Sequence, residues 1–218
     1  MAADAGSQPA ADRPASLAQR AYERIRHELL AKRAGAFGGR LVEHQLAREL
    51  EMSRTPVRDA LRRLALAGLV EPAPGGGYAP RRVRLRDVNE QYELRLVLEP
   101  EAAALAAEHT GSSLAALLDD GDDLATMGAA FHLAIAKASN NLVLARSIAA
   151  INEQSFLHRM SGISDRAALE RMRGGHEEVR RAVTASDPEA ARAAMTAHLV
   201  LARDMFVAEL RSAARATR

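Results

Sequence analysis

Three histidines in the second half of the chain have the residue type and the surroundings of metal ligands. His176 and His198 each lie on an apolar stripe of a segment with helical periodicity, and His132 lies on a third such stripe. Neutral imidazoles bind zinc, nickel and similar divalent ions, and three of them leave a coordination position open. One inward histidine is usually a core residue with its own hydrogen-bond partner, but three together favour a metal site.

The segments around His176 and His198 bring the two side chains together if they form an antiparallel hairpin. His176 is ten residues before Ser186 and His198 is ten residues after Pro188, with a turn-forming sequence between them. At a rise of about 1.5 Å per residue, both histidines lie roughly 15 Å from the turn. We therefore expect them side by side, facing inward.

Arg95 is a candidate partner for a small-molecule anion. A salt bridge to Glu99, one helical turn later, is equally compatible with the spacing. The three histidines also permit a hydrolase that activates water on a metal ion, but no acidic residue is clearly placed as a general base. The sequence therefore does not predict an enzyme.

The composition predicts a mostly helical protein without disulfides. Hydrophobic residues, chiefly Ala and Leu, make up 48% of the chain and aromatic residues only 3%, and there is no Cys. No apolar run approaches the ~20 residues that cross a bilayer. Residues 1–15 lack the apolar centre of a signal peptide. We expect a disordered tail there and a cytoplasmic protein with no membrane contact.

Charge is distributed unevenly along the chain. Residues 1–85 carry 15 Lys and Arg against 9 Asp and Glu, a net +6, whereas residues 86–218 carry 15 against 19, a net −4. A basic first part is typical of a domain that meets a polyanion, although charge alone is equally compatible with chance clustering.

The periodic segments predict two domains. Helices over residues 16–33, 43–50 and 54–67 precede a β-ribbon whose turn spans residues 72–77, the order of a winged helix-turn-helix over residues 16–84. Pro80 makes the second strand of that ribbon an edge strand. Residues 85–218 read as an all-helical antiparallel bundle, with breaks that include Asn140-Asn141, Gly174-Gly175 and the turn at Ser186.

The third predicted helix has the pattern of a DNA-reading element. Ser53 is a suitable N-cap residue, and Pro56 is tolerated in the first turn. Arg54, Arg58 and Arg62 recur at intervals of four on one face, from which arginine can contact guanine edges or phosphates in a major groove. An ordinary amphipathic helix with a solvated arginine face is the alternative, and the element order and basic charge favour DNA binding.

The sequences LVEHQLA, MSRTPVRDALRRL and GLVEP, in register between Leu41 and Glu71, resemble the GntR family of bacterial regulators. The resemblance implies a winged helix-turn-helix that binds double-stranded DNA. The implied DNA contacts are His44, Ser53, Arg54, Thr55, Arg58 and, at the wing tip, Gly76. Several positions depart from the family pattern. His44 stands where many members have Arg, and Glu51 stands where many have Gly. Gly38-Gly39 replaces the usual Pro-Gly, and the wing has glycine where arginine is common.

Residues 86–218 resemble the FCD effector domain of the FadR-like branch, in its shorter, six-helix VanR-like form. The matching pieces are YELRLVLEPEAAALAA (92–107), FHLAIAKASNN (131–141) and AVTASDPEAARAAMTAHL (182–199), the last preceded by His176. The resemblance implies a homodimer, a small organic acid as effector and a divalent metal ion. The implied metal ligands are His132, His176 and His198, and the same histidines with Arg95 form the candidate effector site.

Gly128 is the main departure in this domain, because metal-binding members have an Asp four residues before the first His. Asp122 and Asp123 cannot replace it on the same helical face. Metal binding is then weaker or depends on the effector's carboxylate, or the histidines bind the effector directly.

Together these features predict a ligand-responsive transcription regulator. A dimer would place two recognition helices on an inverted-repeat operator. We expect a repressor that a small organic acid releases from DNA. The metal-dependent hydrolase is the alternative in which the histidines do chemistry.

Overall fold

The computed structural model describes residues 16–30, 40–81, 83–110, 124–160 and 166–216. It divides into two compact units, Met1–Arg81 and Arg82–Arg218. The sequence predicts a boundary three residues later, between residues 84 and 85. The expected disordered tail, residues 1–15, and the Gly38-Gly39 position lie outside the described residues.

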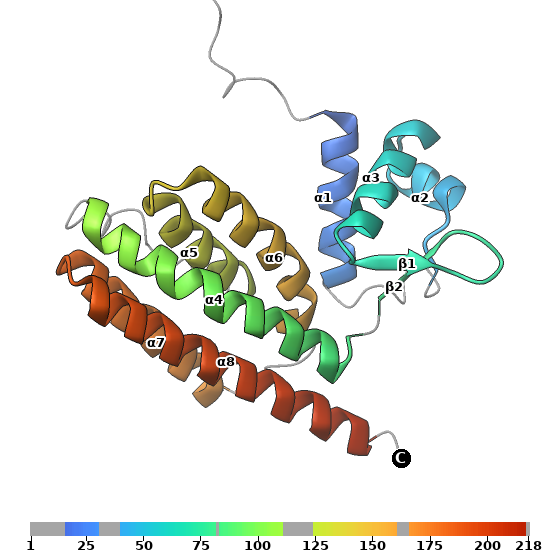
Figure 1. Ribbon diagram of the computed structural model, residues 1–218. Helices are drawn as coiled ribbons and strands as arrows, with labels where there is room; N and C mark the ends of the chain where they lie inside the picture. Colours follow the sequence, from blue (N-terminus) through green and yellow to red (C-terminus); the bar gives the residue numbers. More distant parts are fainter. Residues whose placement is uncertain (1–15, 31–39, 82, 111–123, 161–165, 217–218) are drawn as a thin grey trace, which may run out of the picture. The chain divides into compact units, whose positions relative to one another are not determined.

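The N-terminal unit is a winged helix-turn-helix, as predicted. Its helices are α1 (Leu17–Leu30), α2 (Glu43–Glu49) and α3 (Arg54–Leu66), followed by β1 (Val70–Pro72) and β2 (Tyr78–Pro80) (Figure 1). Apolar side chains spaced three and four residues apart on the helices form its core. The fully buried members include Ile25, Leu46, Val57, Leu61 and Leu64.

The wing is a two-stranded antiparallel ribbon in which Val70 pairs with Pro80 and Pro72 with Tyr78. Pro80 lies on a terminal strand of this two-stranded sheet, consistent with its missing N–H. Leu41, just before α2, forms a further bridge to Tyr78. The ribbon is therefore joined to the segment that leads into the helix-turn-helix.

The C-terminal unit is a helical bundle of α4 (Leu85–Thr110), α5 (Leu124–Ala138), α6 (Leu142–Met160), α7 (Arg166–Thr184) and α8 (Pro188–Ala216). Helices α7 and α8 form the expected hairpin, and α4 packs along α8 (Figure 1). The predicted sixth helix is not tested, because residues 111–123 and 161–165 lie outside the described part. Within the described residues, no helix has the length and apolar character needed to cross a bilayer.

Two tight turns in this unit use the same local device. Asn140 and Ser186 adopt left-handed conformations with φ of 54° and 55°, which end α5 and α7. The next residue then caps the following helix: Asn141 Oδ1 accepts from Leu144 N, and Asp187 Oδ1 accepts from Ala190 N, each at 3.0 Å. Both predicted breaks are confirmed.

The predicted break at Gly174-Gly175 is wrong, because both glycines lie inside α7. Two glycines weaken an isolated helix by about 2 kcal/mol relative to alanine. The buried face of α7, with Val179 and Val183 packed in the bundle core, offsets that cost through apolar burial.

Candidate functional site

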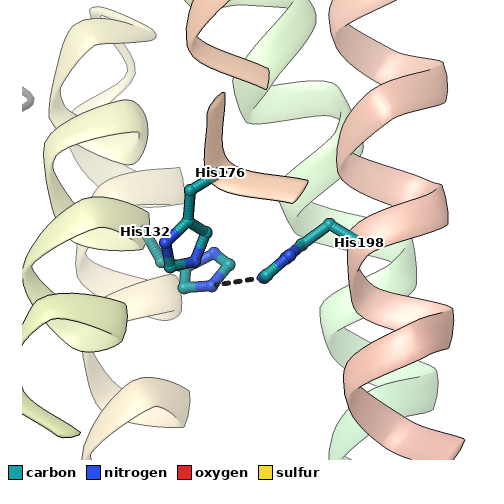
Figure 2. A group of neighbouring side chains, drawn as sticks. All are labelled: His132, His176 and His198. Atoms are coloured by element: carbon teal, nitrogen blue, oxygen red, sulfur yellow. Dashed lines mark hydrogen bonds between the residues drawn. The ribbon is translucent and has the colours of Figure 1, made fainter. Parts of the chain in front are cut away.

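The three histidines meet inside the bundle, one from each of three helices. His132 comes from α5, His176 from α7 and His198 from α8, and Figure 2 shows their rings turned toward a common point. All three are buried. One ring nitrogen from each lies within 4.8 Å of the others, and Nε2 of His132 is 3.3 Å from Nε2 of His198.

This arrangement fits a divalent metal ion. Two nitrogens bound at about 2.0–2.1 Å to one tetrahedral zinc ion lie roughly 3.3 Å apart. The pKa of His198 lies well below its usual range, chiefly because the ring is buried and secondly because His132, His176 and Arg95 are close to it. The imidazole is therefore neutral, which is the form that ligates metal. The three histidines would hold such an ion, which would polarise an oxygen ligand in the open position.

Glu99 of α4 orients one of the three rings. His132 Nδ1 lies 2.6 Å from Glu99 Oε2, a close charge contact, and Nε2 of the same ring faces His198. Metal-ligating histidines commonly donate from their second ring nitrogen to a carboxylate. The sequence names Glu99 only as a partner of Arg95, because the contact with His132 joins residues far apart in the chain.

Arg95 pairs with the same Glu99 carboxylate, so the salt bridge that the spacing allows is present. Arg95 Nε donates to Glu99 Oε1 at 2.5 Å, and both side chains are buried. Burial alone would raise the pKa of the Glu99 carboxyl, but Arg95 and then His132 overcome this and leave that pKa well below its usual range. A contact between Arg95 and an effector anion stays a prediction.

Packing around the imidazoles depends on Phe131 and Gly175. The Phe131 ring stacks on His176 with centroids 4.1 Å apart. A Cβ atom at Gly175 would lie 2.5 Å from His198 Nδ1 and 3.2 Å from its Cβ. Gly175 therefore permits the close approach of α7 to His198, which explains why glycine is found within a helix there.

Gly128 is buried in α5, one turn before His132. The ligand cluster found among the described residues contains three histidines and no carboxylate. Asp122 and Asp123 lie outside the described residues. Among the described residues, no carboxylate joins the histidines as the metal ligand that the family resemblance implies.

The candidate DNA contacts all lie on the surface of the N-terminal unit. The exposed residues are His44, Ser53, Arg54, Thr55, Arg58 and Gly76. Ser53 occupies the N-cap position of α3 as predicted, but its hydroxyl makes no capping hydrogen bond. The N-terminal end of α3 and its N-cap thus present two hydroxyls and two guanidinium groups to solvent.

The turn between α2 and α3 carries backbone strain. Glu51 has a φ of 54°, in the left-handed region that favours glycine. The sequence marks the same position as one where relatives often have Gly. The turn keeps its shape because Leu50 and the α3 residue Val57 are buried on either side of it.

Comparisons with known proteins agree with these two units. Residues 17–79 match the family described as bacterial regulatory proteins, gntR family, and residues 90–201 match the FCD domain. The chain is 31% identical to a probable D-xylose utilization operon transcriptional repressor of Paenarthrobacter nicotinovorans, over 74% of this chain and 76% of that protein. It is 30% identical to the regulator LutR of Bacillus subtilis, over 74% and 88%.

This chain belongs to the GntR family.

It is a DNA-binding transcription regulator with an FCD effector-binding domain. The GntR family is a family of non-enzymatic regulators, and nothing in the comparisons supports the predicted alternative of a metal-dependent hydrolase. Solved structures show the same fold. Escherichia coli McbR/YncC has a TM-score of 0.74 at 24% identity, covering 90% of this chain and 100% of that one. A putative GntR regulator from Rhodococcus has a TM-score of 0.75 at 23% identity, covering 89% and 99%.

Proposed function

We propose that this regulator is a cytoplasmic, homodimeric repressor whose FCD domain binds a divalent metal ion and a small carboxylate effector. The observation that carries the proposal is the convergence of three buried imidazoles from three helices. A single buried histidine is a common core residue, but three rings with facing nitrogens have no packing role that requires imidazole.

The charges around the histidines favour a carboxylate as the effector. The carboxylate of Glu99 is paired with Arg95, so the cluster has no uncompensated negative charge among its described neighbours. A divalent ion in a buried site needs negative charge nearby. Gly128 contributes none, and an effector carboxylate would supply both the charge and an oxygen ligand in the open position.

The N-terminal unit, called the head below, would act on double-stranded DNA through the N-terminal turn of α3. Arg54 and Arg58 are exposed there, in the position from which a recognition helix reads the major groove. Two heads in a dimer would meet the half-sites of an inverted-repeat operator. Effector binding would release DNA only to the extent that it favours the state with lower DNA affinity.

Metal content tests this proposal directly. Tag-free wild-type protein, analysed by elemental mass spectrometry, should contain about one divalent ion per chain, and His176→Ala should lose it. His109→Ala is the matched control, because His109 is exposed on α4 and contacts Leu105 O, and it should keep the metal. Wild-type protein that stays metal-free after incubation with zinc or nickel would overturn the metal site.

The effector's part is tested at Gly128. Gly128→Asp adds a carboxylate one turn before His132, and it should raise metal retention in the absence of any organic acid. It should also weaken the stabilising effect of added carboxylates on thermal unfolding. Equal carboxylate effects on the variant and the wild type would contradict an effector that completes the metal shell.

A further inference from the structure

The strands and the turn of the wing, residues 70–80, contain no cation, and Arg81 follows them at the base of the ribbon. Between Val70 and Pro80 there is one charged residue, Glu71, and three successive glycines form the tip. Gly75, Gly76 and Gly77 have φ values of 80°, 92° and 76°. The tip therefore consists of bare backbone and the charged side chain of the ribbon is acidic, an unfavourable surface for meeting a polyanion.

A bridge outside the ribbon brings a distant arginine to this tip. Leu41 N donates to Tyr78 O at 2.7 Å, and Tyr78 N donates to Leu41 O at 2.9 Å. Leu41 is buried, and a Cβ atom at Gly77 would lie 2.6 Å from its carbonyl oxygen. The segment entering α2 is thus held tightly against the wing, and Arg40 is the residue immediately before Leu41.

The Arg40 guanidinium is bound over the glycine loop. Its Nε donates to Gly76 O at 2.5 Å and its Nη2 donates to Gly75 O. These acceptors are neutral, and no ion pair joins Arg40 to a carboxylate of the described residues, so its charge is not cancelled there. Nη1 makes neither bond and keeps its two N–H donors.

We propose that Arg40 supplies positive charge at the glycine tip of the wing and binds a DNA backbone phosphate there, besides bracing the glycine loop. The inference rests on the proposed contact between the N-terminal unit and DNA. A planar guanidinium can donate to two carbonyls along one edge and to a phosphate along another. Arg40 is partly exposed, and it reaches the tip from outside the ribbon, so no inspection of the wing sequence identifies it.

Salt dependence separates phosphate binding from bracing. The probe is a DNA duplex selected from a random-sequence pool by the wild-type protein, and affinity is followed by fluorescence anisotropy over a salt series. Loss of one phosphate contact should lower the slope of log K against log salt by about 0.9 per head. Arg40→Ala and Arg40→Gln should show the same reduction, although glutamine keeps a donor for the loop carbonyls.

Two comparisons keep this test decisive. Arg146→Ala removes an exposed arginine of α6 in the other unit and should leave the slope unchanged, and thermal unfolding checks that every variant is folded. If the Arg40 variants lose affinity with an unchanged slope, Arg40 only braces the loop and the phosphate contact is overturned. If the wild-type protein itself shows no salt-dependent binding, the DNA contact of the head fails rather than the role of Arg40.

Discussion

The polar residues with candidate functions have opposite surroundings in the two units. In the N-terminal unit Arg54, Thr55 and Arg58 are exposed on α3. In the bundle Glu99 and the histidine cluster are buried, and charge-assisted contacts link Arg95 to Glu99 and Glu99 to His132. The first set is organised for a partner outside the molecule, and the second set is part of the core.

This difference sets how each region responds to substitution. An exposed arginine is solvated whether or not its partner is present, so its removal alters binding and leaves folding nearly unchanged. A buried charge that loses its partner keeps the full cost of desolvation. Substitutions in the buried polar cluster of the bundle should therefore change stability as well as ligand binding, whereas substitutions of the exposed α3 residues should change binding alone.

The largest effect is expected at Glu99. Glu99→Gln leaves the Arg95 guanidinium buried without its counter-charge and should lower the free energy of unfolding by about 3–5 kcal/mol. Because Glu99 orients His132, affinity for added zinc should also fall roughly 10–100-fold. Urea unfolding and metal titration measure the two effects.

Glu90→Gln is the matched control for this substitution. Glu90 pairs with Arg86 at the same spacing on the same helix, but both side chains are largely exposed, and exposed pairs contribute little. Its unfolding free energy should stay close to that of the wild type. Equal losses for both variants would mean that burial does not distinguish the two pairs.

An effect on binding alone is expected at Arg58. Arg58→Ala should weaken binding to a selected DNA duplex by about 1–3 kcal/mol if the side chain reads a base. The unfolding free energy should change by less than about 0.5 kcal/mol, since the side chain is exposed. Unchanged DNA affinity would remove Arg58 from the interface, and a large loss of stability would contradict the contrast between the units.

Two neighbouring glycines of α7 provide a further contrast between an exposed and a buried position within the bundle. Gly174 is exposed and has nothing within 4 Å of an added Cβ, so Gly174→Ala should stabilise the protein by up to about 1 kcal/mol. Gly175→Ala gains the same helix propensity but meets His198, at a cost of about 1–3 kcal/mol. Thermal unfolding of both variants measures the difference, and equal stabilisation by both would mean that His198 moves aside freely.

Much of the fold and part of the site follow from local sequence pattern. The three head helices, the ribbon, the hairpin turn at Ser186 and the inward faces of His176 and His198 are all predictable, because periodicity and turn residues act within a few neighbouring positions. The distance of these two histidines from the hairpin turn depends only on the rise per residue of the helix. The break assigned to Gly174-Gly175 is wrong because burial of the opposite face outweighs the low helix propensity of glycine.

Residue type and periodicity are enough to predict most of the helical segments, their apolar faces and the unit that carries the basic charge. The folded arrangement is needed to see that Glu99 contacts His132, that Gly175 makes room for His198 and that Arg40 reaches the wing tip. Each of these three contacts joins residues more than twenty positions apart. Such contacts depend on how whole elements pack, and no local periodicity or propensity records that packing.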